Sequence, residues 1–79
     1  MTPLKRARIA RKWTLADVSA RLALLGDPID SGNLSRVERG VQRASTTLAE
    51  NLSRVFDGDI TEIHILYPER FIDSSDTAD

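Results

Sequence analysis

The chain has 79 residues, no cysteine and a formal net charge of −1. This length is enough for one small hydrophobic core and too short for two domains, and the lack of cysteine excludes a disulfide framework and a thiolate metal site. No apolar run approaches the roughly 20 residues of a membrane span, and the opening "MTPLKRARIARKW" lacks the apolar centre of a secretory signal. We therefore expect a cytoplasmic protein with no membrane partner.

The first two predicted helices lie within residues 3–25. Pro3 suits a first helical turn, and Thr14 is a good N-cap for the second helix, with Asp17 three residues later as a short-armed equivalent of the capping-box glutamate. The apolar stripe of that second helix consists of Leu15, Val18, Leu22 and Leu25. The helix ends at "GDP", where Gly26 can adopt a left-handed conformation and Pro28 prevents the helix from resuming.

Two more helices follow this turn. Asp30 caps the third, which has Leu34 and Val37 on its inner face and ends at Gly40. Ser45 or Thr46 begins the fourth. Its inward face is formed by Leu48, Leu52 and Val55, with Phe56 beside them.

The fifth predicted helix is short and stops at Pro68. Its apolar residues are Ile60, Ile63, Leu66 and Tyr67. We thus predict an all-α fold, a compact five-helix bundle over residues 1–67, followed by an acidic tail over residues 68–79 that has nothing to bury after its first few residues.

The charges are divided unevenly along the chain. Residues 1–43 carry nine basic and four acidic side chains, for a net charge of +5, whereas residues 44–79 carry two basic and eight acidic ones, for −6. Such asymmetry favours a nucleic-acid partner for the first half of the chain. Solvated helix faces would give the same blocks of charge, so both interpretations stay open.

The second and third helices, with small polar residues in the first turn of the third, form the helix-turn-helix pattern. Any small helical bundle contains two consecutive helices, so the pattern alone is weak. The order "LKRARIARKWTLADVSARL", "IDSGNLSRVERG", "LAENLSRVFDGDITEI" carries the resemblance further. Over about residues 4–67 it resembles the phage-repressor and Cro type (Xre-like) of helix-turn-helix protein, above all in "LSRVERG", which is similar to the segment that closes the family's recognition helix.

The resemblance implies a lambda-repressor-like fold with a central helix-turn-helix. It implies a sequence-specific transcriptional regulator without a cofactor, a phage- or plasmid-type repressor that binds a palindromic operator in double-stranded DNA as a homodimer. Two features depart from the family pattern. Leu15 replaces a glutamine that helps to dock the second helix, and "ALLGDP" lengthens the turn between the two helices.

Individual positions follow from the same resemblance. Arg8 and Glu38 match an ion pair between the first and third helices, and Thr14 matches a cap that contacts the DNA backbone. Arg39 and Arg43 match phosphate-contacting positions after the recognition helix. The groove-facing positions are Ser31, Gly32, Ser35 and Arg36.

Arg36 is the best candidate for reading a base, because a guanidinium can donate two bonds to guanine O6 and N7. A phosphate contact or a solvated arginine remains the alternative. Asn33 could pair with adenine, although we favour a bond from its side chain back to the backbone. Gly32 either lets the helix approach the groove floor closely or is a tolerated poor helix former in the first turn.

Enzymatic chemistry is not expected. His64 is the single histidine and lies in the apolar segment "EIHILY", where a packed or surface imidazole is the ordinary role. No second histidine or cysteine completes a metal site or a nucleophile pair. The alternative to a repressor is an antitoxin or another protein-interaction module whose acidic C-terminal part binds a partner protein.

A homodimer requires an apolar surface beyond the core. The end of the predicted bundle supplies more apolar side chains than a short terminal helix needs to bury. We therefore place the dimer interface at the fifth helix and the start of the tail. Its residues in this prediction are Ile60, Ile63, Leu66, Tyr67, Phe71 and Ile72.

Overall fold

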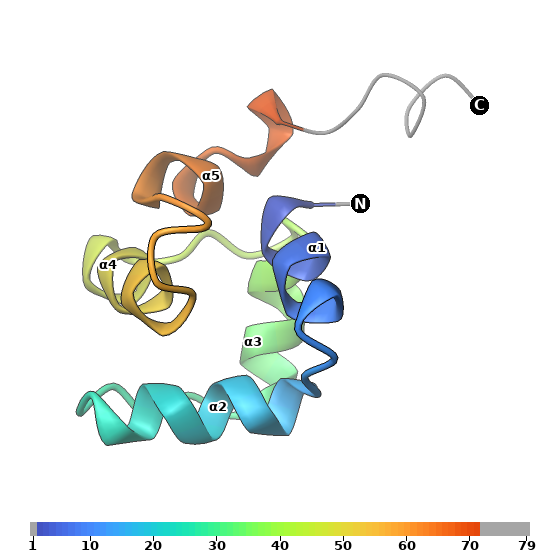
Figure 1. Ribbon diagram of the computed structural model, residues 1–79. Coiled ribbons are helices and arrows are strands. Elements are labelled where there is room, and N and C mark those ends of the chain that lie inside the picture. The colour runs from blue at the N-terminus through green and yellow to red at the C-terminus, as the bar shows by residue number, and fades with distance from the viewer. Residues whose placement is uncertain (1, 72–79) are drawn as a thin grey trace.

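A computed structural model describes residues 2–71, and every regular element within them is a helix (Figure 1). The α-helices are α1 (Pro3–Ala10), α2 (Leu15–Leu24), α3 (Ser31–Glu38), α4 (Thr46–Val55) and α5 (Glu62–Leu66), and a 3₁₀ turn, η1 (Pro68–Arg70), follows α5. This confirms the predicted all-α class with five helices. The predicted tail from Ile72 onward lies outside the described residues.

The helices pack around one core. In Figure 1, α2 lies along the bottom of the view and α3 runs from it toward α1. α4 packs on α2 and on α5, and α5 packs in turn on α1. The first and last α-helices are therefore neighbours, and α3 is held between α2 and α1.

The core is formed by the stripes that the sequence predicted. Its largest fully buried side chains are Phe56, Leu22, Leu34, Leu52 and Val18. Full burial of each such side chain contributes about 1.5–3 kcal/mol relative to leaving it in water. Leu25 is 44% exposed, because α2 ends one residue before it and the chain turns there.

The ends of the helices follow the predicted capping. The Thr14 hydroxyl accepts from the backbone N–H of Asp17 at 3.1 Å, and the Asp17 carboxylate accepts from the N–H of Thr14 at 2.8 Å. The backbone bond from Thr14, followed by the contact with its hydroxyl, lowers the pKa of Asp17. Gly26 and Gly40 close α2 and α3 with φ of +82° and +79°, a region that costs glycine little.

One prediction about the end of the bundle is wrong. Ile60 precedes α5 rather than lying on it, and its side chain is 4% exposed. The Ser53 hydroxyl donates to its carbonyl at 3.0 Å, which holds the residue against α4. Ile60 belongs to the core and is not available to a dimer interface.

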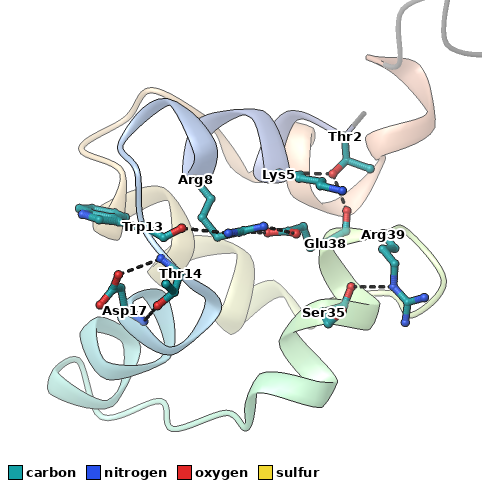
Figure 2. Close-up of polar contacts among 9 residues, drawn as sticks. All are labelled: Thr2, Lys5, Arg8, Trp13, Thr14, Asp17, Ser35, Glu38 and Arg39. Carbon is teal, nitrogen blue, oxygen red and sulfur yellow. Dashed lines mark hydrogen bonds and ion pairs between the residues drawn. The ribbon is translucent and has the colours of Figure 1, made fainter.

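The predicted pair between Arg8 of α1 and Glu38 of α3 is present (Figure 2). Arg8 Nε lies 2.5 Å from Glu38 Oε2, and Arg8 Nη2 donates to Glu38 Oε1 at 3.0 Å. The two side chains are 15% and 5% exposed. The hydrogen bond to Glu38 raises the pKa of Arg8 although burial opposes the charge, so the guanidinium stays protonated.

Other bonds reinforce this pair. Arg8 Nη1 donates to the Trp13 carbonyl at 2.9 Å, which fixes the connection between α1 and α2. The Thr2 hydroxyl, at the N-cap of α1, donates to the backbone carbonyl of Glu38. The last turn of α3 is therefore bonded to α1 through its side chain and to the α1 N-cap through its main chain (Figure 2).

Glu38→Ala should destabilise the free protein strongly. Removing one partner of a buried pair leaves an uncompensated charge, at a cost of about 3–5 kcal/mol. Urea unfolding without DNA measures the effect, and Glu50→Ala, an exposed glutamate on α4, is the matched control. Equal midpoints for the two variants would show that the pair does not support the fold.

Candidate nucleic-acid interface

The exposed side of α3 carries the predicted groove-facing residues. Gly32, Ser35, Arg36 and Arg39 follow one another at the i, i+3, i+4 and i+7 spacing that places residues on one helical face. Gly32, Arg36 and Arg39 are exposed, and Ser35 is half-buried. Ser31 begins the helix and is also exposed.

The opposite side of α3 is locked into the protein. Leu34 and Val37 are buried in the core, and Glu38 forms an ion pair with Arg8. Because Glu38 is the one acidic residue of α3, the surface of this helix carries basic and small polar side chains. The exposed face of α3 thus carries the cations Arg36 and Arg39, on a helix whose opposite side is held in the core.

Asn33 orients Arg36 rather than bonding to the backbone. The Asp30 carboxylate accepts from the Asn33 N–H at 2.6 Å and so caps the first turn of α3. Asn33 Oδ1 instead accepts from Arg36 Nη1 at 2.9 Å. The interpretation that favoured a backbone bond for the Asn33 side chain was wrong, because Asp30 already caps the turn. A neutral amide therefore orients the Arg36 guanidinium without cancelling its charge.

The predicted phosphate contacts differ in their surroundings. Arg39 is exposed and makes one long bond, 3.4 Å, from Nε to the Ser35 carbonyl (Figure 2). The Thr14 hydroxyl accepts one bond as the α2 cap and keeps its own hydrogen as a donor. Both groups lie at helix ends, where they can reach a partner outside the protein.

Arg43 is engaged with the C-terminal part of the chain. Its Nη1 donates to the Leu66 carbonyl at 2.6 Å, its Nη2 lies 4.0 Å from a Glu69 carboxylate oxygen, and its guanidinium lies 5.4 Å from the Tyr67 ring centroid. Arg43 thus joins the loop after α3 to the end of α5. No local pattern predicts this contact, since the partners are 23 or more positions away.

The turn between α2 and α3 is bonded at two points. The Ser19 hydroxyl donates to the Ile29 carbonyl at 2.5 Å, and Asn51 Nδ2 of α4 donates to Asp27 Oδ2 at 3.1 Å. Sequence reasoning missed both bonds, although Asn51 on the inner face of α4 was a signal, because a buried amide needs partners. These bonds fix where α3 begins.

Gly32 is not required by the fold. A Cβ placed there would meet the nearest atom, Asp30 Oδ1, at 3.6 Å, which is ordinary contact. Gly26 differs, because its φ of +82° suits glycine and strains other residues. The described contacts of the free protein therefore leave room for a side chain at position 32.

The residues predicted for a dimer interface do not all share one environment. Ile63 is 54% exposed, Tyr67 40% and Phe71 36%, while Leu66 is half-buried against the core. The guanidinium groups of Arg43 and Arg70 lie 5.4 Å and 4.8 Å from the Tyr67 ring centroid, and Phe71 packs on His64 with ring centroids 4.2 Å apart. Ile72, the last predicted interface residue, lies outside the described residues.

Comparisons with protein-family models, curated proteins and solved structures found no match to this chain. Within residues 2–71, no group of histidine and carboxylate side chains could hold a metal ion, and none of the helices has the length and apolar character needed to cross a bilayer. The features of the described residues that bear on function are therefore the exposed face of α3 and the charges around it.

Gly32→Ala should stabilise the free protein by about 0.5–1 kcal/mol, because alanine is the better helix former and its Cβ has room. Gly26→Ala is the control within the same chain and should destabilise, since its backbone conformation is unfavourable for alanine. Denaturant midpoints measure both. A loss of stability in Gly32→Ala would mean that the fold itself requires this glycine.

Proposed function

We propose that this protein is a sequence-specific DNA-binding regulator of transcription, a repressor of the phage or plasmid kind. In this proposal α2 and α3 are the helix-turn-helix of a lambda-repressor-like domain, and α3 is the recognition helix. The observation that carries the proposal is the exposed Gly32, Ser35, Arg36 and Arg39 face of a helix whose other side is bonded to the core. That face is positively charged and is no wider than a single helix, which a major groove can accept.

In this proposal Ser31, Gly32, Ser35 and Arg36 of α3 face the bases. The major groove of B-DNA is about 12 Å wide and admits one helix of about 10–12 Å diameter. Arg36, oriented by Asn33, can present two donors to a guanine edge. Ser31 and Ser35 can bond to bases or phosphates, and Gly32 removes the side chain that would otherwise hold the helix away from the groove floor.

Phosphate contacts position this helix. Thr14 at the α2 N-cap can donate its hydroxyl hydrogen to a phosphate, beside the Asp17 carboxylate that accepts from its backbone N–H. Arg39 at the C-cap of α3 supplies a cation beyond the base-reading residues. Arg43 could reach a phosphate on the same side only by giving up its bond to Leu66.

A dimer completes the proposed function. One short helix reads only a few base pairs, whereas two recognition helices about 34 Å apart read a palindrome across one helical turn of DNA. Ile63, Tyr67 and the exposed edge of Phe71, with Leu66 beside them, provide an apolar surface for a second copy. The acidic second half of the chain would then lie away from the DNA.

Arg36→Ala and Arg39→Ala should separate base reading from phosphate contact. On DNA selected from the region upstream of the coding sequence, Arg36→Ala should weaken the binding free energy by about 1–3 kcal/mol. On unrelated DNA it should weaken the binding free energy much less. Arg39→Ala should weaken both DNAs alike and reduce the slope of log affinity against log salt by about one per half-site. Gel-shift titrations at several salt concentrations measure both effects.

Arg54→Ala, an exposed arginine on α4, is the control and should change neither affinity. Gly32→Ala belongs in the same assay, where it should weaken binding although it stabilises the fold. If the purified wild-type chain shifts no DNA without a second protein, the repressor proposal is wrong.

Ile63→Asp should convert the dimer to a monomer without unfolding it, because Ile63 is 54% exposed and an aspartate there stays hydrated outside the interface. Light scattering across a concentration series measures the mass. Leu24→Asp, at an exposed leucine on α2, is the control and should leave the dimer intact. A wild-type protein that is monomeric at high concentration, with and without DNA, would contradict the proposed dimer.

A further inference from the structure

A cavity of about 410 Å³ lies between α1 and the C-terminal part of the chain. Its walls include Arg6, Ala7 and Ala10 of α1, together with Ile60, His64 and Phe71. Pockets that hold small molecules in proteins commonly measure about 300–1,000 Å³. The volume is therefore sufficient for a compact organic ligand.

The cavity exists because α1 carries alanine where it faces α5. Ala7 and Ala10 are three residues apart and so lie on one face of α1. Ile60, 4% exposed, contributes an apolar floor, and the Phe71 ring, packed at 4.2 Å on His64, forms a side wall. An aromatic or alicyclic group would find apolar contacts on several sides.

The polar groups of the cavity favour an anion. Arg11 also lines it, but its Nη2 lies 2.5 Å from Asp59 Oδ2, so these two charges offset one another. Arg6 is exposed, and its guanidinium has no hydrogen-bond or ion-pair partner among residues 2–71, whereas its backbone N–H donates to the Thr2 carbonyl at 3.0 Å. Arg6 therefore leaves one guanidinium charge at the cavity wall available to a ligand.

His64 adds a neutral donor. Its Nδ1 accepts from the Thr61 backbone N–H at 3.0 Å, so the neutral ring carries its hydrogen on Nε2. The imidazole that lines the cavity can then donate from Nε2. One cation and one N–H donor beside an apolar floor match a carboxylate attached to a ring.

We propose that this cavity binds a small organic acid with an apolar ring system and a single carboxylate. The carboxylate pairs with Arg6 and accepts from His64, and the ring packs on Ala7, Ala10 and Phe71. The site is separate from the exposed face of α3, and the proposal does not depend on DNA binding.

The test is a calorimetric titration of the full chain, without DNA, with 1-naphthoate and with its neutral analogue 1-naphthamide. We expect the acid to bind at least tenfold more tightly than the amide. Arg6→Ala should abolish that preference, whereas Arg54→Ala, at an exposed arginine on α4, should preserve it. Equal affinities of acid and amide for the wild-type chain would overturn the proposal.

A second pair of variants tests the location. Ala10→Leu places a larger side chain at the cavity wall and should lower naphthoate affinity at least tenfold. Ala20→Leu makes the same change at an exposed position on α2 and should leave the affinity unchanged. Circular dichroism establishes that both variants are folded. Equal effects of the two substitutions, or the absence of naphthoate binding to the wild-type chain, would also overturn the proposal.

Discussion

The contact between Arg8 and Glu38 is the constraint on which the arrangement of α3 depends. α3 has eight residues, a length at which an isolated helix is marginal in water, and only Leu34 and Val37 anchor it in the apolar core. Glu38 replaces what would be a third apolar anchor, and Arg8 makes its burial tolerable by meeting both carboxylate oxygens. A buried charge without such a partner would favour release of the helix end.

The Arg8 guanidinium connects several segments of the chain. It bonds to α3 and to the Trp13 carbonyl in the α1–α2 connection, while Thr2 bonds the main chain of Glu38 to the N-cap of α1. No buried side-chain polar atom among residues 2–71 lacks a hydrogen-bond partner. The buried charges of Arg8 and Glu38 are thus paired with each other. Their contact holds α3 in place, although the exposed face of α3 contributes nothing to the core.

Two of the proposed surfaces meet through Arg43. The loop that carries it leaves the end of α3, and its bonds reach Leu66 and Glu69 beside the exposed apolar side chains of the C-terminal part. The proposed recognition helix and the proposed dimer surface are therefore connected by one side chain rather than by a flexible linker. Relative movement of α5 and the loop after α3 would require this contact to break.

Local features of the fold could be predicted from the sequence alone. Helix caps such as Thr14 and Asp30, terminators such as Gly26 and Gly40, and apolar stripes depend on neighbours within four residues, so a linear pattern contains them. The Arg8–Glu38 pair joins residues 30 positions apart, and only the family resemblance made it predictable. The separation of charge between the two halves is likewise a property of the chain itself.

Tertiary packing decided the rest, because it determines which of several equivalent side chains meets a partner. Ile60 and Ile63 are alike in sequence, yet one is buried and the other exposed, since α5 begins only after Ile60. The Arg43 guanidinium donates to the carbonyl of Leu66, 23 residues further along the chain. The cavity beside Ala7 and Ala10 exists because α5 packs on α1, a long-range contact that depends on the whole core rather than on either helix.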